Sequence, residues 1–144
     1  MVPPEMLTRG RSLVKMNPAP QLMGALRWLP AVLWMGGIFY LSHQSSPLGV
    51  DVGASRAALA HVVLFGGLAT LFYWPLAGRS AQVAWAAMAV SFSLAVLYGV
   101  TDELHQAFVD GRVASEADLV IDAAGALAGV TGAALLRLLL RRLQ

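Results

Sequence analysis

The residues of this chain that could do chemistry are concentrated in the stretch YGVTDELHQAFVDGRVASEAD, residues 98–118. It contains five acids, a histidine and an arginine, whereas charged residues make up only 12% of the whole chain. Long apolar segments precede and follow it. Charged groups at a membrane boundary cost free energy unless they are paired or hydrated, so their concentration here predicts a functional site.

Acid–base catalysis is one chemistry that these residues could perform. A histidine titrates near neutral pH and can act as a general base while a carboxylate orients it. We therefore take Glu103 and His105 as candidate catalytic residues, with Arg112 stabilising the negative charge that develops in acyl or phosphoryl transfer. Neither Thr101 nor Ser115 has the context of an activated nucleophile, so water would have to attack. The sequence leaves open whether the chain is an enzyme.

Binding of a phosphorylated molecule is a second chemistry. The guanidinium group of Arg112 matches phosphate in bidentate geometry. Glu116 and Asp118 oppose such binding, because they would repel phosphate unless they were protonated or paired with Arg112. We expect a polar pocket whose substrate-binding residues are His61, Asp102, Gln106, Arg112, Asp118 and Asp122.

A metal site is a third interpretation. His61, Glu103, His105 and Asp118 are all competent ligands. Their spacing matches no closed zinc pattern, and side chains from three helices would have to converge on the ion. We therefore assign no metal and no cofactor from the sequence, which leaves open whether the acidic and histidine cluster binds a metal.

The composition indicates an integral membrane protein. Hydrophobic residues make up 58% of the 144, and the mean hydropathy is +0.66. The absence of cysteine excludes a disulfide framework and thiolate chemistry. A helix needs about 20 residues to cross a bilayer, and four apolar segments reach or approach this length. We predict an all-α, four-transmembrane-helix bundle, with helices at roughly 26–42, 57–77, 81–100 and 119–140.

The chain divides into a tail and one membrane domain. Residues 1–25 are predicted to form a basic, flexible cytoplasmic tail that contacts anionic lipid headgroups, and residues 26–142 to form the four-helix domain. We find no repeat, no phosphate-binding glycine loop and no nucleic-acid motif. Membrane lipids are therefore expected partners, and nucleic acid is not.

Charge asymmetry predicts the topology. Basic residues in short loops mark the cytoplasmic side of a membrane. Eight of the ten basic residues fall on one side of the predicted helices, and every acid except Glu5 falls on the other, which gives +7 against −5. Both termini should therefore be cytoplasmic, and the stretch 98–118 should lie at the extracytoplasmic face.

Helical spacing predicts which face of the last helix meets protein. Asp118, Asp122, Gly125, Gly129 and Gly132 are separated by four, three, four and three residues, which places them on one stripe. Small residues let transmembrane helices approach closely. A glycine facing lipid gains no packing, and a carboxylate facing lipid costs free energy. We expect the whole stripe to face protein.

Several candidates also have a purely structural explanation. His61 and Asp122 could hydrogen-bond between helices, and Asp102 could pair with Arg112. Intramembrane hydrogen bonds contribute roughly 0.6 to 2 kcal/mol each, which is reason enough for some of these residues. The same structural reasoning does not extend to Glu103, His105, Gln106 and Arg112, because residues at the water boundary are not needed for cohesion of the bundle.

The stretch also contains turn and capping signals. The Asp110-Gly111 pair predicts a turn after the third helix, since glycine accepts backbone angles that other residues resist. Ser115, three residues before Asp118, is typical of a capped helix start. Part of the acidic character is thereby explained by ordinary capping.

Several ordered motifs of the chain point to a known family: FYLSHQ (39–44), His61 with Phe65, YGVTDELHQAFVDGR (98–112), Ser115, Asp118, and the set Asp122, Gly125 and Gly129. They resemble the motifs of the VanZ-like family of small bacterial integral membrane proteins. The resemblance covers roughly residues 30–132. The family usually has an Asp-Lys pair at the positions of Ala57 and Ala58. This chain lacks the aspartate, and Arg56 could replace the lysine only.

The resemblance implies a multi-pass protein of the bacterial cytoplasmic (inner) membrane that is linked to the cell envelope. The namesake of the family is associated with glycopeptide (teicoplanin-type) antibiotic resistance. We therefore expect the pocket to face outward and to engage a lipid-linked or phosphorylated envelope precursor. The alternative is a small transporter, a flippase-like element or an accessory subunit without catalysis, which would require a homo-oligomer or a partner membrane protein.

Overall fold

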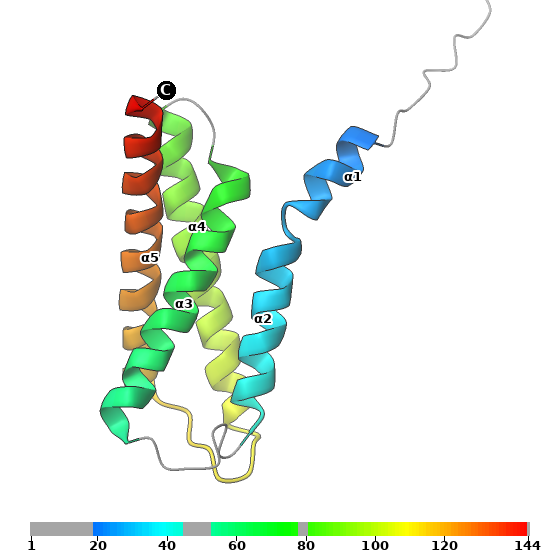
Figure 1. Ribbon diagram of the computed structural model, residues 1–144. Helices are drawn as coiled ribbons and strands as arrows, with labels where there is room; N and C mark the ends of the chain where they lie inside the picture. The colour runs from blue at the N-terminus through cyan, green and yellow to red at the C-terminus, as the bar shows by residue number, and fades with distance from the viewer. Residues whose placement is uncertain (1–18, 45–52, 78–80, 144) are drawn as a thin grey trace, which may run out of the picture.

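The computed structural model describes residues 19–44, 53–77 and 81–143, and its regular elements there are all helices. They are α1 (Ala19–Leu26), α2 (Leu29–Ser42), α3 (Ala54–Leu76), α4 (Ala81–Gln106) and α5 (Glu116–Arg142) (Figure 1). Of the predicted tail, residues 1–18 lie outside the described part, and the remainder belongs to α1.

The prediction of an all-α chain with four apolar helices is confirmed. Four helical stretches are long and apolar enough to cross a membrane: Leu22–Ser42, Ala54–Leu76, Ala84–Gln106 and Glu116–Arg142. Helices α4 and α5 extend beyond the predicted apolar runs 81–100 and 119–140, because polar residues at the ends of these runs continue the helical backbone. The cytoplasmic location of both termini stays a prediction.

Local sequence explains where the helices begin and turn. Pro30 lies in the first turn of α2, where its missing amide hydrogen is no loss. Gly111 adopts a positive φ of 79° in the turn after α4, as the Asp110-Gly111 pair predicts. Ser115 caps α5 by accepting a hydrogen bond from the Asp118 amide at 3.2 Å, so the predicted capped start is confirmed.

Helices α3, α4 and α5 form the tightly packed part of the bundle, and α2 lies against α3 and α4 with less contact (Figure 1). The α3 side of the core consists of Phe65, Leu68, Ala69 and Tyr73, each at most 1% exposed. Two side-chain bonds to carbonyls tie α2 to its neighbours: the Trp34 indole donates to Leu64 on α3, and the Tyr98 hydroxyl on α4 donates to Met35.

Glycines let α3 and α5 touch through their backbones. A Cβ atom added to Gly125 would lie 2.6 Å from the Val62 carbonyl oxygen, and one added to Gly129 would overlap the Gly66 carbonyl. This arrangement is the small-residue packing that transmembrane helices use to approach closely. The prediction that Asp122, Gly125 and Gly129 face protein is confirmed.

The prediction is wrong for Gly132. This residue is exposed, and an added Cβ would meet nothing within 4 Å. The buried positions after Gly129 are Val130 and Ala133. At 100° per residue, they lie about 160° and 100° around the helix axis from Gly132, so the packed face turns away from it.

The two glycines provide a matched test of the α3–α5 contact. We expect Gly129→Ala to lower the free energy of unfolding by about 1–3 kcal/mol, because its Cβ has no space against Gly66. Gly132→Ala should leave stability unchanged or raise it by up to about 1 kcal/mol, since alanine is the better helix former. Unfolding of both variants in detergent measures the difference, and equal effects would contradict the close packing of α5 against α3.

Candidate functional site

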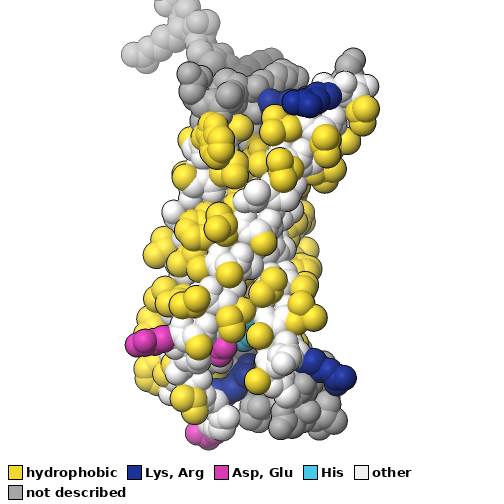
Figure 2. Space-filling view, turned by 90° about the vertical axis from the view of Figure 1, so that its left-hand side faces the viewer, with side chains coloured by type: hydrophobic (Ala, Val, Ile, Leu, Met, Phe, Trp, Pro, Cys, Tyr) yellow, Lys and Arg dark blue, Asp and Glu magenta, His cyan; other side chains and the backbone are white. Residues whose placement is uncertain are grey.

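The polar side chains gather at one end of the bundle, where α2 and α4 finish and α3 and α5 begin. We call this the polar end. In Figure 2 the acidic and histidine side chains visible on one face all lie toward this end, while basic side chains appear at both ends. The middle of that face is mostly apolar, as expected of a surface in contact with lipid.

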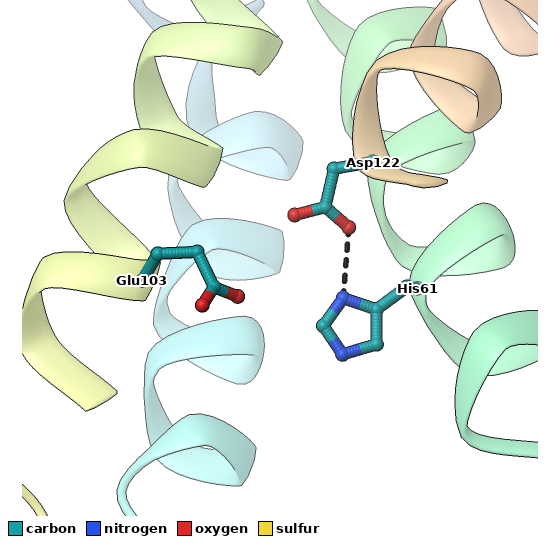
Figure 3. Close-up of side chains that lie close together, drawn as sticks. All are labelled: His61, Glu103 and Asp122. Carbon is teal, nitrogen blue, oxygen red and sulfur yellow. Dashed lines mark hydrogen bonds and ion pairs between the residues drawn. The ribbon is translucent and has the colours of Figure 1, made fainter. Parts of the chain in front are cut away.

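A histidine–carboxylate pair joins α3 to α5 at the polar end. The Nδ1 atom of His61 lies 2.8 Å from Oδ1 of Asp122 (Figure 3). The Asp122 side chain is completely buried, and that of His61 is 16% exposed. The bond lies directly beside the backbone contact between Val62 and Gly125, so the close approach of the helices sets its length.

Space for the Asp122 carboxylate depends on Gly99 of α4. A Cβ atom at position 99 would lie 3.2 Å from Oδ2 of Asp122 and 3.3 Å from the Phe65 ring. Any larger residue would therefore press on the buried carboxylate. Sequence reasoning did not identify this role, although a glycine directly after Tyr98 in an apolar helix was the available signal.

Glu103 links α4 to the start of α5. Its Oε2 atom accepts a hydrogen bond from the Ser115 amide at 2.7 Å. The residue is 8% exposed, and its Oε1 atom has no hydrogen-bond partner. Because Ser115 is the N-cap of α5, this bond fixes where that helix begins relative to α4.

Three helices thus bring one ionisable side chain each to a common point. His61, Glu103 and Asp122 offer one nitrogen or oxygen atom each, and these atoms all lie within 4.8 Å of one another. Figure 3 shows their side chains pointing toward one another from α3, α4 and α5. We call these three residues the polar cluster. It has the groups for hydrogen bonding, for acid–base chemistry or for binding a cation.

Asp102 and Gln106 are both buried, but they pair with each other. The Gln106 amide donates to Oδ2 of Asp102 at 2.9 Å, four residues apart on α4. The suggested pair between Asp102 and Arg112 is therefore wrong: among the described residues Arg112 forms no ion pair, and its Nε atom is buried without a hydrogen-bond partner. Gln106 lies one helical turn from Asp102 on the same helix, so the two side chains are neighbours. Arg112 lies beyond the turn that follows α4.

His105 turns toward α2 and away from the polar cluster. Its Nε2 atom lies 3.4 Å from Nδ1 of His43, and its ring centre is 4.5 Å from that of Phe39. Glu103, two residues earlier, points instead to the start of α5. Residues two positions apart do not face each other on a helix, so the structure separates the two candidate catalytic residues. It places His61 beside the carboxylates instead.

Asp118 is half-buried in the first turn of α5, where its amide completes the Ser115 cap. A cavity of about 420 Å³ lies at the opposite end of the bundle, between α3, α4 and α5. The substrate pocket expected at the polar end therefore stays a prediction. The cavity is lined by Tyr73, Trp85, Met88, Thr131, Arg137 and Arg141, among others.

Comparison with known proteins identifies one family. A family model described as VanZ/LLP1 matches residues 27–138, most of the chain. The comparisons with curated proteins and with solved structures found no match to this chain. The matched range contains the polar cluster and the glycine contact that positions it.

The His61–Asp122 bond can be measured with a double-mutant cycle. We expect His61→Ala and Asp122→Ala to show a coupling of about 0.6–2 kcal/mol in the free energy of unfolding, the range for intramembrane hydrogen bonds. As a control, Asp122→Ala combined with Thr131→Ala should be additive, because nine residues separate the two positions by about 13 Å along α5. A coupling within experimental error for the first pair would show that the bond contributes nothing to stability.

Proposed function

The chain is a membrane protein of the VanZ/LLP1 family, and we propose that its polar end binds the phosphorylated headgroup of a lipid-linked molecule of the bacterial cell envelope. One observation carries this proposal. The buried side-chain atoms without a hydrogen-bond partner are concentrated at the polar end, and a folded protein seldom leaves such atoms unpaired. Those at this end, among the described residues, belong to Ser42, Asp102, Glu103, Arg112 and Asp122.

Arg112 supports a phosphate headgroup as the ligand. Its Nε atom is buried and unpaired, and guanidinium groups bind phosphate through paired hydrogen bonds. The nearby acids would repel a phosphate, but among the described residues none of them forms an ion pair with Arg112. Asp102, Glu103 and Asp122 already accept hydrogen bonds from Gln106, Ser115 and His61 respectively.

Exposed apolar side chains beside the polar end support a lipid as the rest of the ligand. Phe39 and Tyr40 of α2 are 50% and 68% exposed, and Leu104 and Phe108 in and just after α4 are 61% and 87% exposed. A molecule with its headgroup at the polar end would lay its hydrocarbon chain along such a surface. Apolar side chains are exposed along all the spanning helices, so a lipid could reach the polar end with its headgroup while its hydrocarbon chain stays in the membrane.

Hydrolysis of the bound lipid is a second candidate function, which the His61–Asp122 pair favours. A carboxylate bonded to Nδ1 orients the imidazole ring and leaves Nε2 to accept a proton from water. Glu103, not His105, is then the nearest further acid or base. A carrier or accessory subunit would share the binding step without this chemistry.

The role in glycopeptide (teicoplanin-type) resistance belongs to the same proposal. A protein that sequesters or alters a lipid-linked wall precursor would change the amount available to such an antibiotic. The proposal places the chain in the inner membrane with both termini in the cytoplasm, so that the polar end meets the envelope.

Lipid binding by Arg112 is tested with a polyprenyl phosphate and the matching polyprenol, each added to the purified protein in detergent. We expect the phosphate to bind more tightly, and Arg112→Gln to raise its Kd by about tenfold to 150-fold, the equivalent of about 1.5–3 kcal/mol for a hydrogen bond to a charged group. Arg56→Gln removes an exposed arginine from the start of α3 at the same end and should have little effect. Equal affinity for the two lipids, or equal effects of the two variants, would refute the assignment.

The topology is tested by labelling single cysteines in intact cells. The chain has no cysteine of its own, so any label on it reports the introduced residue. Val113 and Leu143 are each 83% exposed and lie at opposite ends of the bundle. A membrane-impermeant thiol reagent should modify Val113→Cys in intact cells and Leu143→Cys only after the membrane is opened. The reverse pattern would place the polar end in the cytoplasm and remove the envelope ligand from consideration.

A further inference from the structure

The polar cluster has the composition of a cation site. It combines one imidazole nitrogen with two carboxylates, supplied by three different helices, and the ligating atoms lie within 4.8 Å of one another. Nitrogen and oxygen donors without sulfur suit divalent first-row cations such as Zn²⁺ and Mn²⁺. Figure 3 shows the Glu103 carboxylate and the His61 ring on either side of one small space, with the Asp122 carboxylate at its edge.

Both carboxylates are buried, and each has one oxygen atom without a partner. Asp122 is 0% exposed with Oδ2 unpaired, and Glu103 is 8% exposed with Oε1 unpaired. Figure 3 shows the second oxygen of Asp122 turned away from His61, on the side of Glu103. Buried carboxylates are normally hydrogen-bonded throughout, paired with a cation or bound to a metal.

No basic side chain of the described residues supplies the missing positive charge. The single ion pair there joins Asp122 to His61, which is positive only when protonated. Neither Glu103 nor Asp122 pairs with a lysine or an arginine in that part of the chain. Two negative charges in a weakly polar interior would be balanced by one divalent ion.

We propose that His61, Glu103 and Asp122 together bind one divalent cation of the Zn²⁺ or Mn²⁺ class. Ligands of such an ion lie about 2.1 Å from it, so in tetrahedral coordination they are about 3.4 Å from one another. The widest separation, at most 4.8 Å, therefore needs to close by up to about 1.4 Å, and the 2.8 Å distance between His61 and Asp122 needs to open by about 0.6 Å. Side-chain rotation supplies movements of this size. The ion takes the position of the proton between Nδ1 of His61 and Oδ1 of Asp122.

The position of the site gives the ion access to ligands. Three protein ligands leave at least one coordination position for water or for an oxygen atom of another molecule. His61 is the partly exposed member of the cluster, so this position opens toward the polar end. The assignment does not depend on the proposed lipid, although a bound cation would give a phosphate oxygen a positive contact among these acids.

Direct metal binding tests the site. The full chain, purified without a histidine tag and treated with a chelator, is titrated with ZnCl₂ and separately with MnCl₂, and the bound metal is counted by mass spectrometry after dialysis. We expect about one ion of the preferred metal per chain. Glu103→Gln and Asp122→Asn should each weaken binding about tenfold or more, since loss of even an outer-shell partner of a metal site costs that much.

Two variants provide matched controls. Glu116→Gln removes an exposed acid from the first turn of α5, and His105→Ala removes one member of the His43–His105 pair, the other place where nitrogen ligands meet. Both should keep the stoichiometry and affinity of the unaltered chain. Metal should also raise the melting temperature of the unaltered chain and of both controls, but not that of Glu103→Gln, which retains an oxygen for the Ser115 amide.

Three results would overturn the site. The first is no binding of either metal by the unaltered chain at millimolar concentration. The second is binding that survives both Glu103→Gln and Asp122→Asn. The third is binding that His105→Ala alone abolishes, which would assign the metal to the histidine pair. Because the titration uses metal without lipid, failure here leaves the lipid-binding proposal standing, and failure of lipid binding leaves the metal site standing.

Discussion

The backbone contact between α3 and α5 is the constraint on which the polar end depends. Gly66, Gly125 and Gly129 remove the side chains that would hold the two helices apart. Without that contact, the short side chains of His61 and Asp122 would not span the gap between their helices. The helices instead place them 2.8 Å apart on the side of the contact nearest the polar end. Packing in the apolar part of the bundle thus determines the geometry of its polar part.

Helix α4 completes the arrangement by two different means. Gly99 leaves room for the Asp122 carboxylate, and Glu103 holds the amide of Ser115 where α5 begins. One residue acts by having no side chain and the other by a charge-assisted hydrogen bond. Buried carboxylates placed in this way are costly unless something compensates their charge. A fold that holds two of them beside an imidazole, with oxygen atoms unpaired, therefore suggests a ligand.

The candidate residues show where spacing arguments succeed and where they stop. Spacing along one helix correctly predicts that Asp122, Gly125 and Gly129 face protein, because the angle per residue is constant in a helix, but it fails for Gly132, where the stripe has turned away from the contact. It did not predict that His105 contacts His43 on α2, since that depends on where a separate helix lies. Nor did it predict that Asp102 pairs with Gln106 in preference to Arg112, because both partners were within reach along the sequence. The convergence of Glu103 with His61 and Asp122 likewise required three helices to be placed together.

The sequence by itself determined the class of the protein, its four apolar helices, the capped start of α5 and the stretch that holds most of its acidic residues. These properties follow from composition, local backbone preference and the helical repeat, all of which act over a few residues or sum over the whole chain. Only the tertiary structure decided which ionisable groups meet. Their meeting depends on the rotation and separation of helices distant in sequence, and here that separation was set by whether a Cβ atom fits at Gly125 and Gly129.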